Sequence, residues 1–70
     1  MKVSYKKLWK LLIDKDMSKA DLRKRVDFAP NTLTKLRNNE EVSLSILRRI
    51  AECLDCDIGD MVEFVKEDEG

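Results

Sequence analysis

The sequence contains no histidine, one proline and two glycines, and only 6% of its 70 residues are aromatic. Without histidine, and with only two cysteines, the chain cannot complete a tetrahedral zinc site from thiolates and imidazoles. The scarcity of proline and glycine argues against a loop-rich or fibrous protein. There is also no glycine-rich phosphate loop and no persuasive nucleophile–base pair. We therefore expect no enzymatic activity, no metal, no cofactor and no small-molecule substrate.

Long apolar runs are missing as well. No stretch approaches the roughly 18 apolar residues of a membrane span, and lysines interrupt the pattern of "MKVSYKKLWKLL", which makes it a poor signal peptide. Cys53 and Cys56 form a lone C-x-x-C at the end of an expected helix, where the helix dipole raises rather than lowers a thiol pKa. We therefore predict buried free thiols in a cytoplasmic protein that does not contact the membrane.

The net charge is zero, but the two halves of the chain differ strongly. Residues 1–38 carry eleven basic and four acidic residues, a net charge of +7, whereas residues 39–70 carry three basic and ten acidic residues, a net charge of −7. This division predicts a basic surface for an anionic partner, and it also allows the halves to attract each other in the fold. The length allows one domain, residues 1–66, followed by an acidic tail at 67–70.

Apolar residues recur at helical spacing, so the sequence predicts an all-α fold of five helices near residues 4–15, 18–26, 30–37, 43–54 and 58–63. Serine or aspartate stands at four of the starts, as Ser4, Ser18, Ser43 and Asp57, and Ser18 with Asp21 resembles a capping box. Pro30 fits the first turn of the third helix. The short segments "KVSY" and "EFV" predict a two-stranded ribbon between the two ends of the domain.

The apolar stripes predict a single core. Its expected members are Leu8, Trp9, Leu12, Leu22, Val26, Phe28, Leu33, Leu36, Leu47, Ile50 and Leu54. The stripes of the last two helices also include Leu44, Ala51, Ile58, Met61 and Val62. Trp9 could instead be an aromatic residue for binding, but it continues the stripe of Leu8 and Leu12, so we place it in the core.

About three residues, Asp27 to Ala29, separate the second and third helices, and so short a link makes two helices cross steeply, as in a helix-turn-helix. Asp27 is expected to adopt the left-handed conformation of the turn. Asn31, Thr32, Thr34 and Lys35 form a polar face opposite the leucines of the third helix. Asparagine, lysine and threonine are side chains that read base edges in the major groove. Lys19, Lys24 and Arg25 are placed to meet phosphates.

Residues 5–64 resemble the Cro/phage-repressor (XRE) family of helix-turn-helix proteins, particularly its small standalone bacterial members. The resemblance is carried by "SKADL", "PNTLTKLRNN" and "VSLSILRRIAECLDCDIGDM", in that order. It implies a compact five-helix, lambda-repressor-like domain whose third helix enters the major groove of double-stranded DNA. It implies a sequence-specific transcription regulator, a repressor. Because one domain of this size contacts a single half-site, we also expect a homodimer, at least on DNA.

The resemblance also implies positions for the contacts. The base contacts would be Pro30, Asn31, Thr32 and Lys35. With the cations noted above, the candidate phosphate contacts are Ser18, Lys19, Lys24, Arg25, Thr34 and Asn38. The chain departs from the family at three places: Asp27 replaces a frequent glycine, Ala29 a frequent serine or threonine cap, and Arg23 a small alanine.

Three alternatives stay open from the sequence. The same fold serves as a protein-interaction module, such as an antitoxin or adaptor, and a covered polar face on the third helix would favour that role. Arg48 and Arg49 either reach DNA or pair with the nearby acids Glu52 and Asp55. Phe64 and Val65 either form a dimer surface or pack against Val3 and Tyr5 in the same chain.

Overall fold

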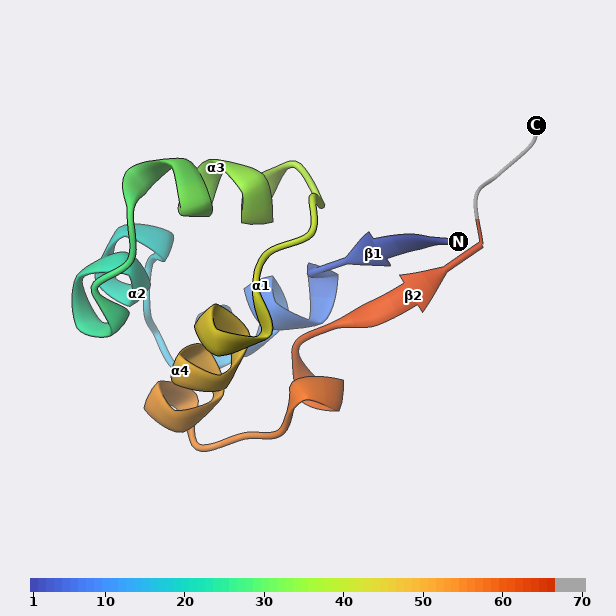
Figure 1. The fold of residues 1–70 in the computed structure, drawn as a ribbon. Coiled ribbons are helices and arrows are strands. Elements are labelled where there is room, and N and C mark those ends of the chain that lie inside the picture. The colour runs from blue at the N-terminus through green and yellow to red at the C-terminus, as the bar shows by residue number, and fades with distance from the viewer. Residues whose placement is uncertain (67–70) are drawn as a thin grey trace.

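The computed structural model describes residues 1–66 and shows a cluster of helices with a short ribbon at one end (Figure 1). Four α-helices, one 3₁₀ turn and two strands occur within these residues. In chain order they are β1 (Lys2–Ser4), α1 (Lys6–Asp14), α2 (Lys19–Val26), α3 (Pro30–Arg37), α4 (Leu44–Leu54), η1 (Ile58–Asp60) and β2 (Glu63–Val65). The expected acidic tail, 67–70, lies outside the described residues.

The predicted fifth helix is wrong in type and length. Only the 3₁₀ turn η1 forms there, and a capping box closes on it, with the Asp57 backbone N–H donating to the Asp60 carboxylate at 3.0 Å. Residues 63–65 then pair with β1. Strand pairing therefore takes up the backbone groups that a longer helix would have used. The described part of the fold is mainly helical, with four helices and a small sheet.

The ribbon is confirmed. β1 and β2 run antiparallel with Val3 opposite Phe64, and this pairing joins the two ends of the described chain (Figure 1). Ser4 is not the N-cap residue as predicted, because it belongs to β1 and α1 begins two residues later, with Tyr5 at its N-cap. Its Oγ nevertheless accepts from the N–H of Lys6, the first residue of the helix, at 3.4 Å. The pairing of β1 thus sets where the first helix starts.

The helices and the ribbon share one hydrophobic core. Its buried members are Val3, Tyr5, Leu8, Leu12, Leu22, Val26, Phe28, Leu36, Leu47, Ile50, Leu54 and Met61. Trp9 and Leu33, expected as core members, are half-buried and pack against this core. Leu44 and Ile58 are exposed, contrary to the expected stripes. They are the first residues of α4 and η1, where the chain enters each element at the rim of the core.

Aspartate and asparagine replace glycine at the helix ends. Asp16, Asp27, Asn39 and Asp55 have positive φ angles of 55°, 61°, 57° and 54°, and each follows one of the four helices. These two residue types tolerate the left-handed region better than other residues with a Cβ atom. The prediction for Asp27 is confirmed, and the scarcity of glycine is explained, because the turns do not depend on it.

The two cysteines are free, but they differ in environment. The prediction of buried thiols is wrong for Cys53, which is exposed on α4, whereas Cys56 is half-buried after the helix. Burial and the nearby Asp60 carboxylate raise the pKa of the Cys56 thiol. Residues 1–66 contain no group of three or more acidic or cysteine side chains arranged to hold a metal ion. Within the same range, no helix is long and apolar enough to cross a membrane.

Candidate nucleic-acid interface

Helix α3 lies along one edge of the molecule (Figure 1). Leu36 is fully buried and Leu33 is half-buried, so these two leucines fix the inner side of the helix to the core. Pro30 occupies the first turn, where its missing N–H leaves no intrahelical bond unmade. The outer side of α3 is left to polar side chains.

Three of these polar side chains form one exposed stripe. Asn31, Lys35 and Asn38 are four and three residues apart and therefore lie on the same face of the helix. All three are exposed. Thr34 lies beside them, also exposed, and its hydroxyl donates to the Pro30 carbonyl at 3.4 Å. The structure thus brings together four of the predicted contact residues on a single surface.

Thr32 and Pro30 take different positions. Thr32 is half-buried, since it precedes the buried Leu36 by one helical turn. Pro30 is exposed at the start of the helix. The predicted base-contact set therefore separates into an exposed pair, Asn31 and Lys35, and two residues at the margin of the same surface.

The candidate phosphate contacts on α2 lie at its two ends, and all are exposed. Lys24 and Arg25 stand in the last turn, next to the link into α3. The ion pairs formed within residues 1–66 are Lys7–Glu63 and Arg48–Glu52, so neither cation has a carboxylate partner in the described chain. Their charge remains available to an anionic partner.

Ser18 and Asp21 fix the start of α2 through the predicted capping box. The Asp21 N–H donates to Ser18 Oγ at 3.0 Å, and the Ser18 N–H donates to Asp21 Oδ2 at 3.1 Å. The hydrogen bond from the Ser18 backbone N–H, followed by one from the Ser18 side chain, lowers the pKa of the Asp21 carboxyl. Ser18 thus already has a structural role where the sequence predicted a phosphate contact.

Lys19 has a neighbour that the sequence did not predict. Its Nζ lies 4.5 Å from the centroid of the Trp9 ring, within the range of a cation–π interaction. The half-buried Trp9 therefore packs against the core with part of its surface and supports Lys19 with its ring. This contact joins α1 to the start of α2.

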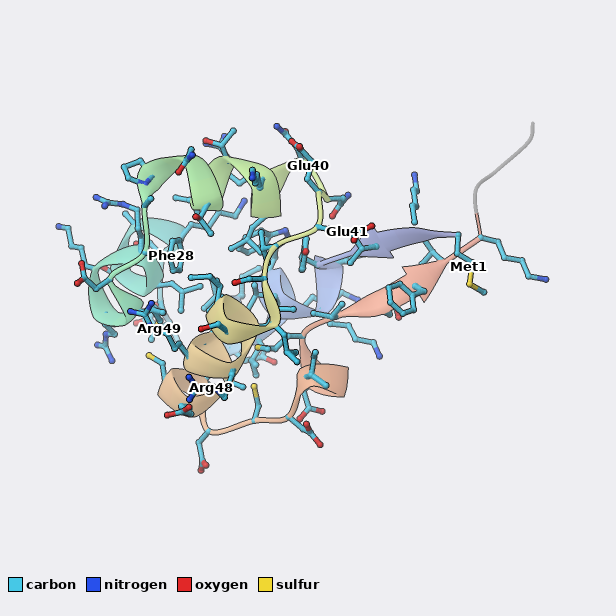
Figure 2. All side chains as sticks on the ribbon, viewed as in Figure 1. Met1, Phe28, Glu40, Glu41, Arg48 and Arg49 are labelled. Carbon is cyan, nitrogen blue, oxygen red and sulfur yellow. The ribbon has the colours of Figure 1, made fainter. Side chains whose placement is uncertain are left out.

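The turn between α2 and α3 is held by a side chain from α4. Asp27 adopts the left-handed conformation, and its N–H donates to the Arg23 carbonyl at 2.8 Å. The carbonyls of Val26 and Asp27 both accept from Arg49. In Figure 2, Arg49 lies between α4 and this turn, close to the buried Phe28.

The two neighbouring arginines thus behave differently. Arg48 pairs with Glu52 at 2.6 Å, as expected if the arginine pairs with a nearby acid instead of reaching DNA. Arg49 contacts backbone carbonyls of the turn, a role that neither interpretation foresaw. Arg23, where a small residue was expected, is half-buried.

The other end of α3 is held by Tyr5. The Tyr5 backbone N–H donates to Asn39 Oδ1 at 3.2 Å, and its phenol donates to the Glu40 carbonyl at 2.7 Å. Tyr5 is only 1% exposed, and this burial raises the pKa of the phenol. Sequence reasoning missed Arg49 and Tyr5 in these roles, because both act across 22 or more positions of the chain and leave no local pattern.

Comparison with known proteins agrees with this geometry. The model of the Cro/C1-type HTH DNA-binding domain matches residues 7–67. The crystal structure of the transcriptional regulator VanUg, Form II, is similar, with 53% sequence identity and a TM-score of 0.92. That alignment covers 94% of this chain and 88% of VanUg. Comparison with curated proteins gave no match.

Proposed function

The chain belongs to the Cro/C1-type helix-turn-helix DNA-binding family, and from that we propose that it is a repressor that reads the major groove with α3. The family and the likeness to VanUg make it a DNA-binding transcriptional regulator, and the direction of regulation is our proposal. One observation carries the mode of binding: α3 buries Leu36 and presents Asn31, Lys35 and Asn38 on a single exposed face.

The chemistry of that face suits base edges and phosphates. Asparagine pairs with adenine N6 and N7, and lysine donates to guanine O6 or N7. We assign these roles to Asn31 and Lys35, with Thr32 and Pro30 at the margin. Lys24 and Arg25 at the end of α2 would contact the DNA backbone, together with Lys19, Thr34 and Asn38. Repression requires only that the protein occupy a promoter, and these contacts would hold it there. We place this activity in the cytoplasm.

The rival role, a protein-interaction module without DNA binding, would need a different occupant for α3. The polar face is not covered by any other part of residues 1–66, since Asn31, Lys35 and Asn38 are exposed. Lys24 and Arg25, which have no carboxylate partner within residues 1–66, favour an anionic partner over a neutral one. We therefore propose that DNA occupies this face of α3. We also propose that the protein has no enzymatic activity.

We also propose that two copies bind each operator. A single module of this kind buries only about 600–1,000 Å² on DNA, which is modest for selective regulation. Phe64 in β2 is 70% exposed even though its backbone pairs with Val3. It borders an apolar hollow of about 260 Å³ that includes Val42, Leu47 and Ile58. This surface, near the end of the described chain, is our candidate for two-fold pairing.

The decisive experiment selects a preferred site from random DNA duplexes and then compares variants on it. Asn31→Ala and Lys35→Ala should each weaken the preferred site by about 1–3 kcal/mol and relax preference at one or two base pairs. Lys19→Ala should weaken all sequences alike, because a phosphate contact carries no sequence information. Sequencing of the bound pools separates these two outcomes.

Lys10→Ala is the matched control, since Lys10 lines a hollow on α1 with Asp14, Asp55 and Asp60. It should bind like the unmodified protein. Selection of no sequence at all would contradict DNA recognition. A changed preference in Lys19→Ala, with none in Asn31→Ala, would show that α3 is not the element in the groove.

A further inference from the structure

We propose that Arg49 is a positioning residue for DNA binding, which holds the turn that sets the direction of α3. The inference rests on the proposed function, because it concerns how α3 is presented to DNA. From α4, the Arg49 guanidinium donates to the carbonyl of Val26 and, at 3.4 Å, to that of Asp27 (Figure 2). Both carbonyls belong to the link between α2 and α3.

These carbonyls need a donor from outside the helix. The last carbonyls of any α-helix have no intrahelical partner and carry the partial negative charge of the helix dipole. The Asp27 N–H closes α2 with one bond, to Arg23, and leaves the Val26 carbonyl free. A guanidinium satisfies such a group with a charge-assisted hydrogen bond, which is stronger than a neutral one. Arg49 therefore caps α2 from across the core.

The turn itself also benefits from an external hold. Asp27 has φ 61° and ψ 53°, a region that costs free energy for a residue with a Cβ atom. Glycine would adopt this conformation at no steric cost. In this chain the hydrogen bonds from Arg49 hold the carbonyls of Val26 and Asp27 in place, and this keeps Asp27 in the left-handed conformation. The side chain on α4 thus supplies a constraint that the local sequence does not.

Small changes at this turn are amplified along α3. The helix has eight residues and is about 12 Å long, so a 10° rotation at the turn moves its far end by about 2 Å. Productive contacts with a ligand require placement within about 0.5 Å. Loss of Arg49 should therefore damage base readout at Lys35 more than general attraction to phosphates.

Arg48 provides a matched control. It is the adjacent arginine on the same helix, its side chain is 65% exposed, and it pairs with Glu52 instead of the turn. Arg48→Gln and Arg49→Gln each remove one positive charge from neighbouring positions. A difference between them reports the contact with the turn and not the charge.

The test measures affinity for the selected site and for unrelated DNA, each as a function of salt. Arg49→Gln should weaken the selected site about tenfold, equivalent to one charge-assisted hydrogen bond, and leave unrelated DNA within about twofold. The slope of log affinity against log salt should match that of Arg48→Gln. Arg49→Lys, which keeps the charge and one donor, should recover part of the loss.

Two results would overturn the proposal. Equal affinity of Arg49→Gln and Arg48→Gln for the selected site would show that the turn does not depend on Arg49. A salt slope reduced by about 0.9 in Arg49→Gln alone, with all sequences weakened alike, would make Arg49 a phosphate contact. If Arg49→Gln does not fold, the same comparisons are made with Arg49→Lys. Full wild-type affinity of that variant, with unchanged amide hydrogen exchange in the turn, would refute the proposal.

Amide hydrogen exchange tests the contact without DNA, so its result stands even if no specific site is found. Arg49→Gln should exchange the amides of residues 27–29 about fivefold faster than Arg48→Gln, because the turn opens more easily without its external donor. Identical exchange in the two variants would contradict the proposal while leaving the proposed function intact.

Discussion

Asp21 shows how one carboxyl makes the stability of α2 depend on pH. Its pKa is lowered by hydrogen bonds from Ser18, so the folded state favours the ionised form. A lowered folded-state pKa contributes stability above the unfolded pKa, near 3.8, and that stability is lost as the pH falls through the folded value. The group is exposed, and the effect concerns the first turn of one helix.

We therefore expect Asp21→Asn to lower the melting temperature at neutral pH and to lose this difference in acid. Thermal melts of both proteins between pH 7 and pH 3 give the measurement. The difference in melting temperature should begin to shrink as the pH falls below 3.8, the ordinary pKa of the carboxyl, and should vanish once the pH has passed the lowered pKa of the folded state. A difference that stays constant across this range would mean that ionised Asp21 has no special role in the cap.

Tyr5 holds the far end of α3 with its phenol, which donates to the Glu40 carbonyl at 2.7 Å. Tyr5→Phe keeps the buried ring and removes only this donor. It should lower the free energy of unfolding by about 1–2 kcal/mol, since a partly buried carbonyl loses its partner. Urea denaturation followed by circular dichroism measures the change, and an unchanged midpoint would show that water replaces the phenol without cost.

Local residue chemistry was readable from the sequence, and long-range chemistry was not. The Ser18–Asp21 box and the left-handed Asp27 depend on neighbours within a few positions, and both predictions are confirmed. Arg49 and Tyr5 act on carbonyls that are 22 and 35 positions away. Only the assembled fold brings those groups together. The prediction that Cys53 is buried was wrong for a related reason: the side of α4 on which it lies decides its exposure, and the fold leaves that side open to solvent.

Helix α3 begins without a side-chain cap. Ala29 occupies the N-cap with a suitable extended backbone, at φ −66° and ψ 150°, but it has no side-chain oxygen to accept a hydrogen bond. α4, by contrast, begins with Ser43, whose Oγ accepts from the Ile46 N–H at 3.2 Å. The two helices therefore offer the same substitution in opposite directions.

We expect Ala29→Ser to raise the free energy of unfolding by about 1 kcal/mol and Ser43→Ala to lower it by a similar amount. Each change gains or removes one cap bond at an exposed position. Chemical denaturation of the two variants beside the unmodified protein checks both signs. If Ala29→Ser were neutral while Ser43→Ala was costly, the first turn of α3 would have its N–H groups satisfied in another way.

At the scale of elements, the sequence predicted the four α-helices well because each has an apolar stripe between recognisable ends. α3 was predicted with its observed bounds, 30–37. The errors gather where strands compete with helices. Both Ser4 and the segment after Asp60 have helical neighbours, yet the pairing of β1 with β2 fixes their backbone. The segments "KVSY" and "EFV" predicted the ribbon itself, but the local pattern did not show that its pairing would delay the start of α1 and replace the end of the fifth helix.

For the molecule as a whole, positive and negative charges are concentrated in different halves of the chain. The basic half contains α1, α2 and α3, and the acidic half contains α4, η1 and β2. The two halves also meet in the fold, as in the Lys7–Glu63 ion pair, whereas Lys24 and Arg25 beside α3 have no carboxylate partner within residues 1–66. The positive charge left beside α3 attracts DNA to that side. The division of charge also places the proposed pairing surface in the acidic half, where like charges would oppose association of free copies.

We accordingly expect a monomer, or a mixture of monomer and dimer, in dilute solution and two chains on each operator. Symmetric pairing would place the two α3 helices about 34 Å apart over a pseudo-palindromic site. Sedimentation of the complex counts the chains. Phe64→Lys should weaken binding to the whole operator and leave binding to a single half-site unchanged. One chain on a site without any repeat would contradict the dimer.

The contact between Lys19 and Trp9 makes the protein its own optical probe. Trp9 is the one tryptophan of the chain, and the Lys19 ammonium lies 4.5 Å from the centre of its ring. A positive charge over an indole face alters the energy and yield of its fluorescence. When a phosphate draws Lys19 away, the emission should change without any attached dye. Engagement of the DNA backbone could then be followed in real time, separately from the reading of bases by α3.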